Sequence, residues 1–187
     1  VFTVNSRGTG TLTIAERSAE GQLGTLRALL RGDEYDQAYT PRFSPDGASV
    51  VYSAWSKGGF RDLRLVNVKD GSFVDLTRDR SLDVQPCWSA DGKTIYFASD
   101  RTGIFNIYAM DVATRSTKMV TNVVNAALGP AVSEDGKTLV YVGYTHSGYD
   151  LFSMALDESQ FLDAPPGEIE RPRPYAEPAP VTATKQR

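Results

Sequence analysis

The residues that most often carry out catalysis are scarce in this 187-residue chain, which contains one histidine and one cysteine. A serine nucleophile needs a base, and His146 is the only histidine that could serve. It lies within residues 143–148, which contain no Gly-x-Ser-x-Gly turn of the kind that presents a nucleophilic serine. His146 and Cys87 together cannot make an internal disulfide, a Cys/His zinc site or a paired-histidine metal centre. We therefore expect no enzymatic activity and no cofactor, and we interpret Cys87 as a small filler on a strand.

Three aspartates recur at regular spacing and raise the question of a metal site. Asp46, Asp91 and Asp135 are 45 and 44 residues apart, and a glycine follows each. A ring of carboxylates could bind a hard cation. An Asp-Gly pair is also typical of a tight turn, because glycine adopts positive φ without steric cost and aspartate accepts hydrogen bonds from its own turn. Turn chemistry explains all three aspartates, so we predict hairpin turns and no metal site.

The Asp-Gly pairs belong to a longer repeat with a period of 44–45 residues. A proline precedes each pair at a fixed offset, and a β-branched apolar run follows it. The prolines are Pro41, Pro86 and Pro130, and the runs begin at Ser49, Thr94 and Thr138. Later markers are Leu63, Ile107 and Leu151, then Asp75-Leu76-Thr77 and Met119-Val120-Thr121. Strand-like runs separated by turns at this period are typical of the blades of a β-propeller.

We interpret each repeat as a four-stranded antiparallel blade. In the first full repeat the strands are expected near 39–44, 49–54, 61–68 and 73–77, and they should recur at offsets of 44–45. The predicted fold class is all-β, a β-propeller segment of about three full blades plus a partial one, part of a larger ring. The predicted organisation is a partial blade over 1–37, blades over 38–80, 81–124 and 125–163, and a proline-rich tail over 164–187.

The two ends of the chain depart from the repeat. Residues 1–37 lack a first strand, and residues 25–30 could form either a fourth strand, which we favour, or a short helix. Six of the ten prolines lie between Pro165 and Pro180. Proline has no amide proton, so this stretch cannot join a sheet interior and should run extended as a linker. Its Pro-x-Pro pattern could instead bind an aromatic groove, but we favour a spacer, which could tether the blades to an envelope or membrane domain of a parent protein.

The composition excludes several other classes of protein. Hydrophobic residues make up 41% of the chain and charged residues 23%, which is enough apolar material for a folded core. The net charge of −3 disfavours nucleic acid as a partner, because phosphate binding needs clustered positive charge. No apolar run reaches the roughly 18 residues of a membrane helix, and no signal-peptide pattern is present. We expect the chain to be a piece of a larger protein.

The second full repeat carries the most specific pattern. In order, its markers are Pro86, Trp88-Ser89, Asp91-Gly92-Lys93, Ser99-Asp100-Arg101, Asn106-Ile107-Tyr108 and Val120-Thr121. This unit resembles the WD40-like PD40 repeat of the TolB-like propeller family, and residues 38–157 follow the pattern throughout. The resemblance implies a repeat protein of propeller blades. It is less specific for function, because the same blade occurs on proteins with different activities.

Two functions follow from the resemblance. TolB itself forms a six-bladed ring that docks a peptidoglycan-associated lipoprotein and contributes to cell-envelope integrity. By resemblance, the first expectation is a non-catalytic protein-binding scaffold in the periplasm or cell envelope of a bacterium. The alternative is the substrate-gating propeller of a prolyl-oligopeptidase-like or tricorn-like serine peptidase. The sequence that follows Arg187 in a parent protein would distinguish them, because a peptidase needs a Gly-x-Ser-x-Gly turn there.

Candidate binding residues lie in loops that gather on one rim of a propeller. Binding hot spots favour Trp, Tyr and Arg, which bury a large area and keep a polar group. The candidates for contact with a protein or peptide are Trp55, Arg101, Tyr144, His146, Tyr35 and Arg78, with Glu34, Lys57, Arg80 and Asn125 in the same loops. Arg101 has a second interpretation, which we favour, as an ion-pair residue between blades. For Trp55, which stands where the repeat usually has aspartate, both a structural and a binding role stay open.

Overall fold

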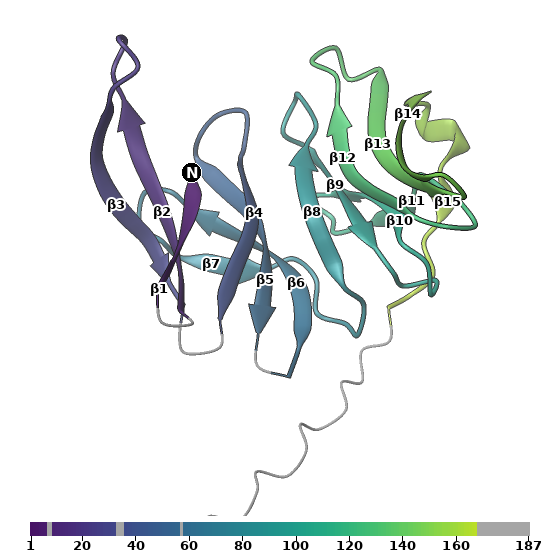
Figure 1. The fold of residues 1–187 in the computed structure, drawn as a ribbon, viewed down its shortest axis with the longest axis horizontal. Coiled ribbons are helices and arrows are strands. Elements are labelled where there is room, and N and C mark those ends of the chain that lie inside the picture. The colour runs from purple at the N-terminus through teal and green to yellow at the C-terminus, as the bar shows by residue number, and fades with distance from the viewer. Residues whose placement is uncertain (7–8, 33–35, 57, 168–187) are drawn as a thin grey trace, which may run out of the picture.

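Each Asp-Gly repeat folds as an antiparallel sheet in the computed structural model, which describes residues 1–6, 9–32, 36–56 and 58–167. Within these residues, four sheets follow one another along an arc, from the purple sheet at left to the green one at right in Figure 1. The first sheet contains β1 (Phe2–Ser6), β2 (Thr9–Arg17) and β3 (Leu23–Arg31). The second contains β4 (Gln37–Phe43), β5 (Ser49–Ser56), β6 (Phe60–Asn67) and β7 (Phe73–Asp75).

The third and fourth sheets continue the repeat. The third contains β8 (Asp83–Trp88), β9 (Thr94–Ser99), β10 (Asn106–Asp111) and β11 (Thr117–Met119), and the short strand β15 (Leu162–Asp163) joins its edge. The fourth contains β12 (Ala127–Val132), β13 (Thr138–Thr145) and β14 (Gly148–Ala155). A 3-10 helix at Glu158–Gln160 is the one helix in the described part of the chain, and it is too short to cross a membrane. The all-β prediction is confirmed.

In the first sheet, the segment that could have formed either a strand or a short helix is a strand. Residues 25–30 lie inside β3, which pairs antiparallel with β2, so the alternative of a short helix is wrong. The boundaries proposed for the individual blades stay predictions.

The fourth sheet has fewer strands than expected. Its predicted fourth strand falls at β15, which pairs with β11 of the third sheet instead of with β14. The position where the repeat places Thr77 and Thr121 is occupied by Pro165, which has neither a hydroxyl nor an amide proton. The Lys118 ammonium also lies 2.6 Å from the Asp163 carboxylate, an exposed ion pair between β11 and β15. Within the described residues, two sheets contain all four repeat strands and are flanked by two three-stranded sheets, which corrects the count of about three full blades for that part of the chain.

Three apolar clusters join neighbouring sheets. The first lies between the first and second sheets and includes Leu12, Leu29, Val50 and Tyr52. The second joins the second and third sheets and includes Val51, Leu63, Phe97 and Tyr108. The third joins the third and fourth sheets and includes Val84, Ile107, Ala127 and Leu139. The first strands β4, β8 and β12 also lie side by side, so the core sits between sheets, as blade packing requires.

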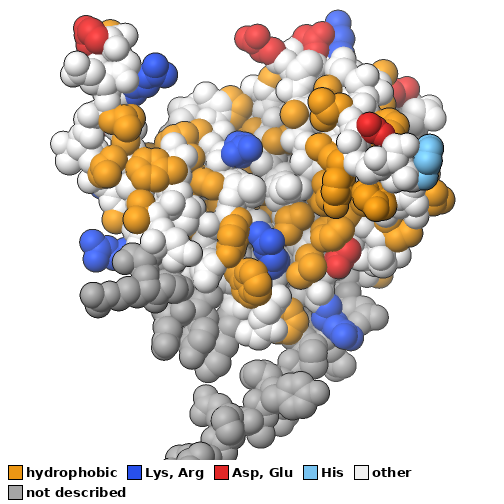
Figure 2. Space-filling view, viewed as in Figure 1, with side chains coloured by type: hydrophobic (Ala, Val, Ile, Leu, Met, Phe, Trp, Pro, Cys, Tyr) orange, Lys and Arg blue, Asp and Glu red, His pale blue; other side chains and the backbone are white. Residues whose placement is uncertain are grey.

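The two end sheets each leave an apolar face without a neighbouring sheet in the part of the chain that is described. Exposed apolar residues on the first sheet are Phe2, Val4, Leu23 and Leu26, and those on the fourth include Tyr149 and Leu151. Figure 2 shows hydrophobic side chains gathered over the first sheet, at left. Such faces differ from the inner ones, where equivalent apolar residues pack against the next sheet.

The Asp-Gly turns have the predicted conformation. Gly47, Gly92 and Gly136 have φ of 70°, 72° and 70°. In each turn the aspartate Oδ1 accepts a hydrogen bond from a serine hydroxyl two residues earlier and from the backbone amide two residues later. These hydrogen bonds, the serine contact first, lower the pKa of all three carboxyls, so the turn explanation of the recurring aspartates is confirmed.

Gly92→Val should destabilise the chain more than Lys93→Ala. Valine at a φ of 72° costs about 1–3 kcal/mol of stability, because a β-branched side chain rarely adopts that conformation. Lys93 makes only a 3.7 Å ion pair between exposed side chains, so its removal should cost under about 0.5 kcal/mol. Thermal unfolding of the two variants measures the difference, and equal melting temperatures would contradict the turn assignment.

Candidate binding rim

The second strands of the second and fourth sheets end in exposed aromatic residues. Trp55 is the penultimate residue of β5 and is 40% exposed, while Tyr144 is the penultimate residue of β13 and is 50% exposed. The two residues occupy equivalent positions of the repeat. In the third sheet that position is Asp100, whose carboxylate accepts a hydrogen bond of 2.7 Å from the Leu82 amide. The aromatic residues therefore replace a structural carboxylate in the sheets on either side.

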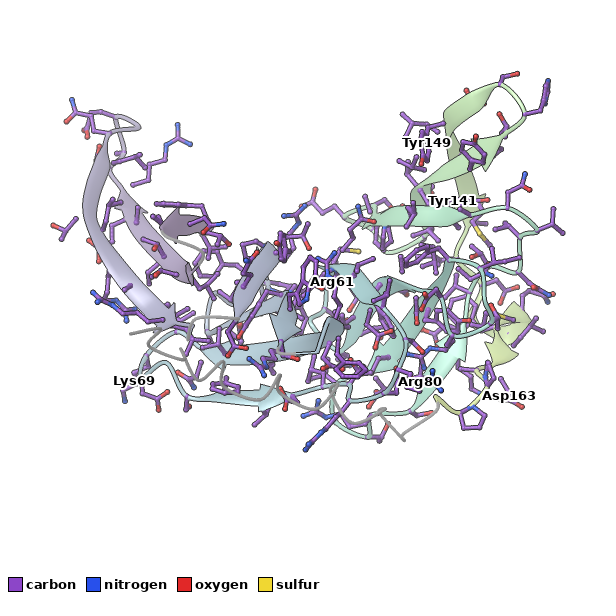
Figure 3. The ribbon with its side chains drawn as sticks, turned by 60° about the horizontal axis from the view of Figure 1, so that its bottom comes forward. Arg61, Lys69, Arg80, Tyr141, Tyr149 and Asp163 are labelled. Carbon is purple, nitrogen blue, oxygen red and sulfur yellow. The ribbon has the colours of Figure 1, made fainter. Side chains whose placement is uncertain are left out.

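Trp55 belongs to a cluster that the sequence analysis did not identify. It pairs across the strands with Arg61, whose guanidinium carbon lies 4.5 Å from the Tyr39 ring centroid and 5.8 Å from that of Trp55. The two ring centroids are 6.2 Å apart. Figure 3 labels Arg61 near the middle of the arc. We call Tyr39, Trp55 and Arg61 the aromatic–arginine cluster.

The guanidinium of this cluster is incompletely bonded in the described residues. Arg61 is half-buried, and its buried Nε makes no hydrogen bond there. Burial lowers the pKa of Arg61, although an arginine remains cationic at neutral pH. A buried donor without an acceptor is costly, because it has lost water without gaining a partner. The cluster therefore places a half-buried cation beside an exposed aromatic ring, while the Nε itself is closed to solvent.

The fourth sheet carries an aromatic pair at the equivalent place. Tyr144 pairs across the strands with Tyr149, and their ring centroids are 5.0 Å apart at an interplanar angle of 61°. The Asn125 side-chain amide donates a hydrogen bond of 3.0 Å to the Tyr144 carbonyl. Figure 3 labels Tyr149 on the last sheet. This tyrosine pair presents two exposed phenol groups on a sheet hairpin, which is a rigid support.

The remaining predicted binding residues are placed differently. His146 is exposed in the turn between β13 and β14, and Arg78 is exposed in the connection between the second and third sheets. Tyr35, Glu34 and Lys57 lie outside the described residues. The structure thus brings Trp55 and Tyr144 into aromatic clusters, and it leaves His146 and Arg78 as exposed loop residues.

Arg101 is in the interior, which corrects its place among the candidate contact residues. Only 6% of its side chain is exposed, and its Nη2 lies 3.0 Å from the Asp83 carboxylate and 3.6 Å from that of Asp79. Its guanidinium carbon is 4.8 Å from the Tyr108 ring centroid, and its Nε donates to the Ser99 hydroxyl. A partner cannot reach a side chain in this position. The ion-pair interpretation agrees with this geometry.

Asp83 has an unusual environment, because its side chain is fully buried and its Oδ2 makes no hydrogen bond in the described residues. Burial raises the pKa of Asp83 from 3.8 to about 6, despite the opposing attraction of Arg101, and the carboxylate of Asp79 adds to the rise. Between these two pKa values the folded chain binds more protons than the unfolded chain. Asp83 therefore lowers stability as the pH rises through this range.

The chain is expected to be more stable at pH 5 than at pH 7, with an Asp83 contribution of about 1 kcal/mol. Urea unfolding at the two pH values measures the difference. Asp83→Asn should remove this contribution, because asparagine does not titrate. A pH difference that survives unchanged in the Asn variant would contradict the assignment to Asp83.

Other groups that could do chemistry are accounted for by packing. Burial raises the pKa of the Cys87 thiol to about 12, which makes its thiolate form rare at neutral pH. The described residues contain no group of three or more His, Cys, Asp or Glu placed to hold a metal ion. The geometry thus favours contact chemistry at the rim, through rings, a guanidinium and backbone groups.

The comparisons with known proteins identify the family. The PD40 family, described as the TolB beta propeller domain, matches residues 23–170. This chain belongs to the PD40 family. The Tol-Pal system protein TolB of Francisella tularensis subsp. holarctica strain OSU18 is 36% identical over 87 residues, which are 44% of this chain and 19% of that protein. The uncharacterized protein Atu1656 of Agrobacterium fabrum is 30% identical over 134 residues, 71% of this chain.

The PD40 chain also matches solved propeller structures. TolB from Acinetobacter baumannii superposes with a TM-score of 0.61 and 25% identity over 76% of this chain and 38% of that chain. A puromycin hydrolase superposes with a TM-score of 0.64 and 18% identity over 79% and 23% of the two chains, which shows the fold alone. The propeller-segment prediction is confirmed. The chain spans 45% of the Agrobacterium relative and 19% of the Francisella relative.

Sequence reasoning missed Tyr39, Arg61 and Tyr149. The signal was available in part, because a hairpin that pairs Ser56 with Phe60 places Trp55 opposite Arg61, and a turn ending at Gly148 places Tyr144 opposite Tyr149. Tyr39 could not be found in this way, since it reaches the cluster from the neighbouring strand β4.

Proposed function

We propose that this PD40 chain is a non-catalytic protein-binding scaffold and that its partner contacts the rim at the aromatic–arginine cluster and the tyrosine pair. The observation that carries the proposal is the half-buried Arg61 guanidinium beside the Tyr39 ring and the 40% exposed Trp55 ring. A partner that supplies a carbonyl or carboxylate oxygen would give this cation an acceptor. A carboxylate would also gain from the positive charge.

The aromatic residues supply the apolar part of such a contact. Trp and Tyr have few rotatable bonds, so they lose little conformational entropy when they bury a large area on binding. Together with Arg they dominate interface hot spots. Trp55 lies beside Arg61, and Tyr144 lies beside Tyr149, at equivalent places two sheets apart. A protein that spans the third sheet would meet both clusters, so the rim favours a protein or an extended peptide over a small molecule.

The proposed location is the periplasm or cell envelope of a bacterium. It is supported by the likeness to proteins named TolB, one of them a Tol-Pal system protein. The likeness to a puromycin hydrolase concerns the fold, and no observation on the rim favours a peptidase-gating role over the binding role.

Replacing Trp55 and Tyr144 together by alanine should weaken capture of a partner while leaving the fold intact. Each hot spot is worth about 2 kcal/mol, which corresponds to about a 30-fold loss of affinity. The immobilised chain is exposed to a bacterial envelope extract, captured proteins are identified by mass spectrometry, and the affinity of the leading one is then measured with purified material.

Phe73→Ala is the matched control, because Phe73 is an exposed aromatic residue on β7, beside Arg64 and away from both clusters. The control should bind as the parent chain does. Equal binding by the parent chain and the Trp55/Tyr144 double variant would show that these rim residues do not contact the partner. Hydrolysis of a peptide substrate by the purified chain would contradict the non-catalytic proposal.

A further inference from the structure

The second and third sheets hold their outermost strands by the same set of hydrogen bonds. The Leu63 amide donates 2.9 Å to the Thr77 hydroxyl, and the Ile107 amide donates 2.8 Å to the Thr121 hydroxyl. In return, the amides of Leu76 and Val120 donate to the carbonyls of Leu63 and Ile107, each at 2.8 Å. In both sheets, an apolar residue followed by threonine therefore joins the fourth strand to the third. We call this set of hydrogen bonds the clamp.

The residue before each of these apolar positions completes the clamp. In the third sheet the Asn106 side-chain oxygen accepts 3.0 Å from the Thr121 hydroxyl and 2.9 Å from the Val123 amide. Asn106 is buried, and so is Asp62 at the equivalent place in the second sheet. In the third sheet the clamp thus combines a side-chain oxygen and an outward-facing amide on the third strand with a threonine on the fourth.

The fourth sheet has the first half of this clamp at Asp150 and Leu151. Leu151 pairs with Val142 as Ile107 pairs with Ala98, so the Leu151 amide and carbonyl point away from β13 toward the outer edge of β14. Asp150 accepts 2.9 Å from the Thr145 hydroxyl with Oδ2, and its Oδ1 makes no hydrogen bond within the described residues. No strand of the described residues pairs with this edge.

The side chains at the two equivalent positions differ in cover by a neighbouring sheet. Ile107 is 0% exposed because it packs against the fourth sheet, whereas Leu151, which has no further sheet beside it in the described residues, is 77% exposed. The position that should supply the threonine is Pro165, and the chain at Leu162–Asp163 pairs with β11 instead. A backbone edge of this kind, with an apolar side chain beside it, is a template for strand addition.

We propose that the outer edge of β14 binds an extended segment of a partner protein that carries an apolar–Thr pair and a net positive charge, as a fourth strand. The equivalent outer edges of β6 and β10 each pair with a fourth strand in the same chain. The charge preference follows from Asp150, because β14 contains this carboxylate and no basic residue. This site is separate from the rim proposed above, since it uses the backbone of β14 and not the rim side chains.

The test uses a synthetic peptide with the sequence of residues 116–123, Ser-Thr-Lys-Met-Val-Thr-Asn-Val, added to the full chain. Backbone NMR should show the Leu151 amide exchanging rapidly in the free chain and becoming protected when the peptide binds. A peptide with valine in place of threonine should bind about tenfold more weakly, because it loses the hydroxyl that both accepts from Leu151 and donates to Asp150.

Two variants of the chain report on Asp150. Asp150→Asn should still bind the threonine peptide, because asparagine fills this role in the third sheet, whereas Asp150→Ala should lose about the same tenfold as the valine peptide. Equal affinity for the two peptides, or binding that leaves Leu151 unprotected, would overturn the proposal. So would a Leu151 amide that is already protected in the free chain, since residues of the chain itself would then fill the edge. The Trp55/Tyr144 double variant should bind the peptide normally, which separates this site from the rim.

Discussion

Arg101→Met is expected to lower the free energy of unfolding by about 3–5 kcal/mol at pH 7, the largest effect of a single substitution that we expect in this chain. The guanidinium is nearly inaccessible to water and neutralises Asp83, whose carboxylate is fully buried. Methionine replaces the aliphatic stem of Arg101, but it removes the guanidinium that lies over the Phe97 and Tyr108 rings and leaves that carboxylate unpaired. The carboxylate must then either stay charged in the interior or take up a proton, and each costs free energy.

A double-mutant cycle distinguishes the ion pair from simple packing. Asp83→Asn in the Arg101→Met background should recover part of the lost stability, because it removes the buried charge that the first substitution leaves unpaired. Urea unfolding of the four chains gives the coupling energy. Arg78→Ala, which removes an exposed arginine from the connection between the second and third sheets, should change stability by under about 0.5 kcal/mol. Additive effects of the two interior substitutions would rule out the ion pair as the source of the stability.

The repeat made the strands and turns predictable from the sequence. Asp-Gly pairs and β-branched runs act locally, so the three hairpins at Gly47, Gly92 and Gly136 appear where the pattern placed them. For Arg101, an ion-pair role could be favoured over partner contact because its Ser-Asp-Arg-x-Gly context belongs to the repeat itself. These features depend on residues that are close together in sequence.

A bulge in the first strand of the second, third and fourth sheets was not predictable by the same reasoning. The residues before the three prolines, Thr40, Gln85 and Gly129, have positive φ of 47°, 54° and 56°, and the strand register shifts at each. A residue before proline usually prefers the extended region, so local rules predict the opposite. The bulge is explained by contacts between sheets, since the Gln85 side-chain oxygen accepts 2.9 Å from the Gly129 amide of the next first strand.

The candidate binding residues were likewise predictable only where the signal lies within the repeat, and not where it depends on contacts between strands. Trp55 and Tyr144 were found because they break the repeat where aspartate is usual. Tyr39 contacts Arg61 from a different strand, and that contact depends on how far β4 overlaps β5 beyond the bulge. The displaced strand β15 was missed because the repeat alone does not say which of two sheet edges a two-residue strand will choose.

Ile107→Ala should cost about 2–5 kcal/mol of stability, whereas Leu151→Ala at the same place in the next repeat should cost under about 0.5 kcal/mol. Both substitutions shorten an apolar side chain on the third strand of a sheet. Ile107 packs in the cluster that includes Ala127 and Leu139 of the fourth sheet, so its truncation leaves a cavity, while Leu151 has little packing to lose.

Urea unfolding of the two variants, with Leu63→Ala as a second buried control, measures the contrast. Leu63 is as buried as Ile107 and faces the third sheet, so it should behave as Ile107 does. A large cost for Leu151→Ala would show that the outer face of the fourth sheet is covered in solution. Analytical ultracentrifugation would then tell whether a second copy covers it, because that cost would fall on dilution, whereas cover from the chain itself would not depend on concentration.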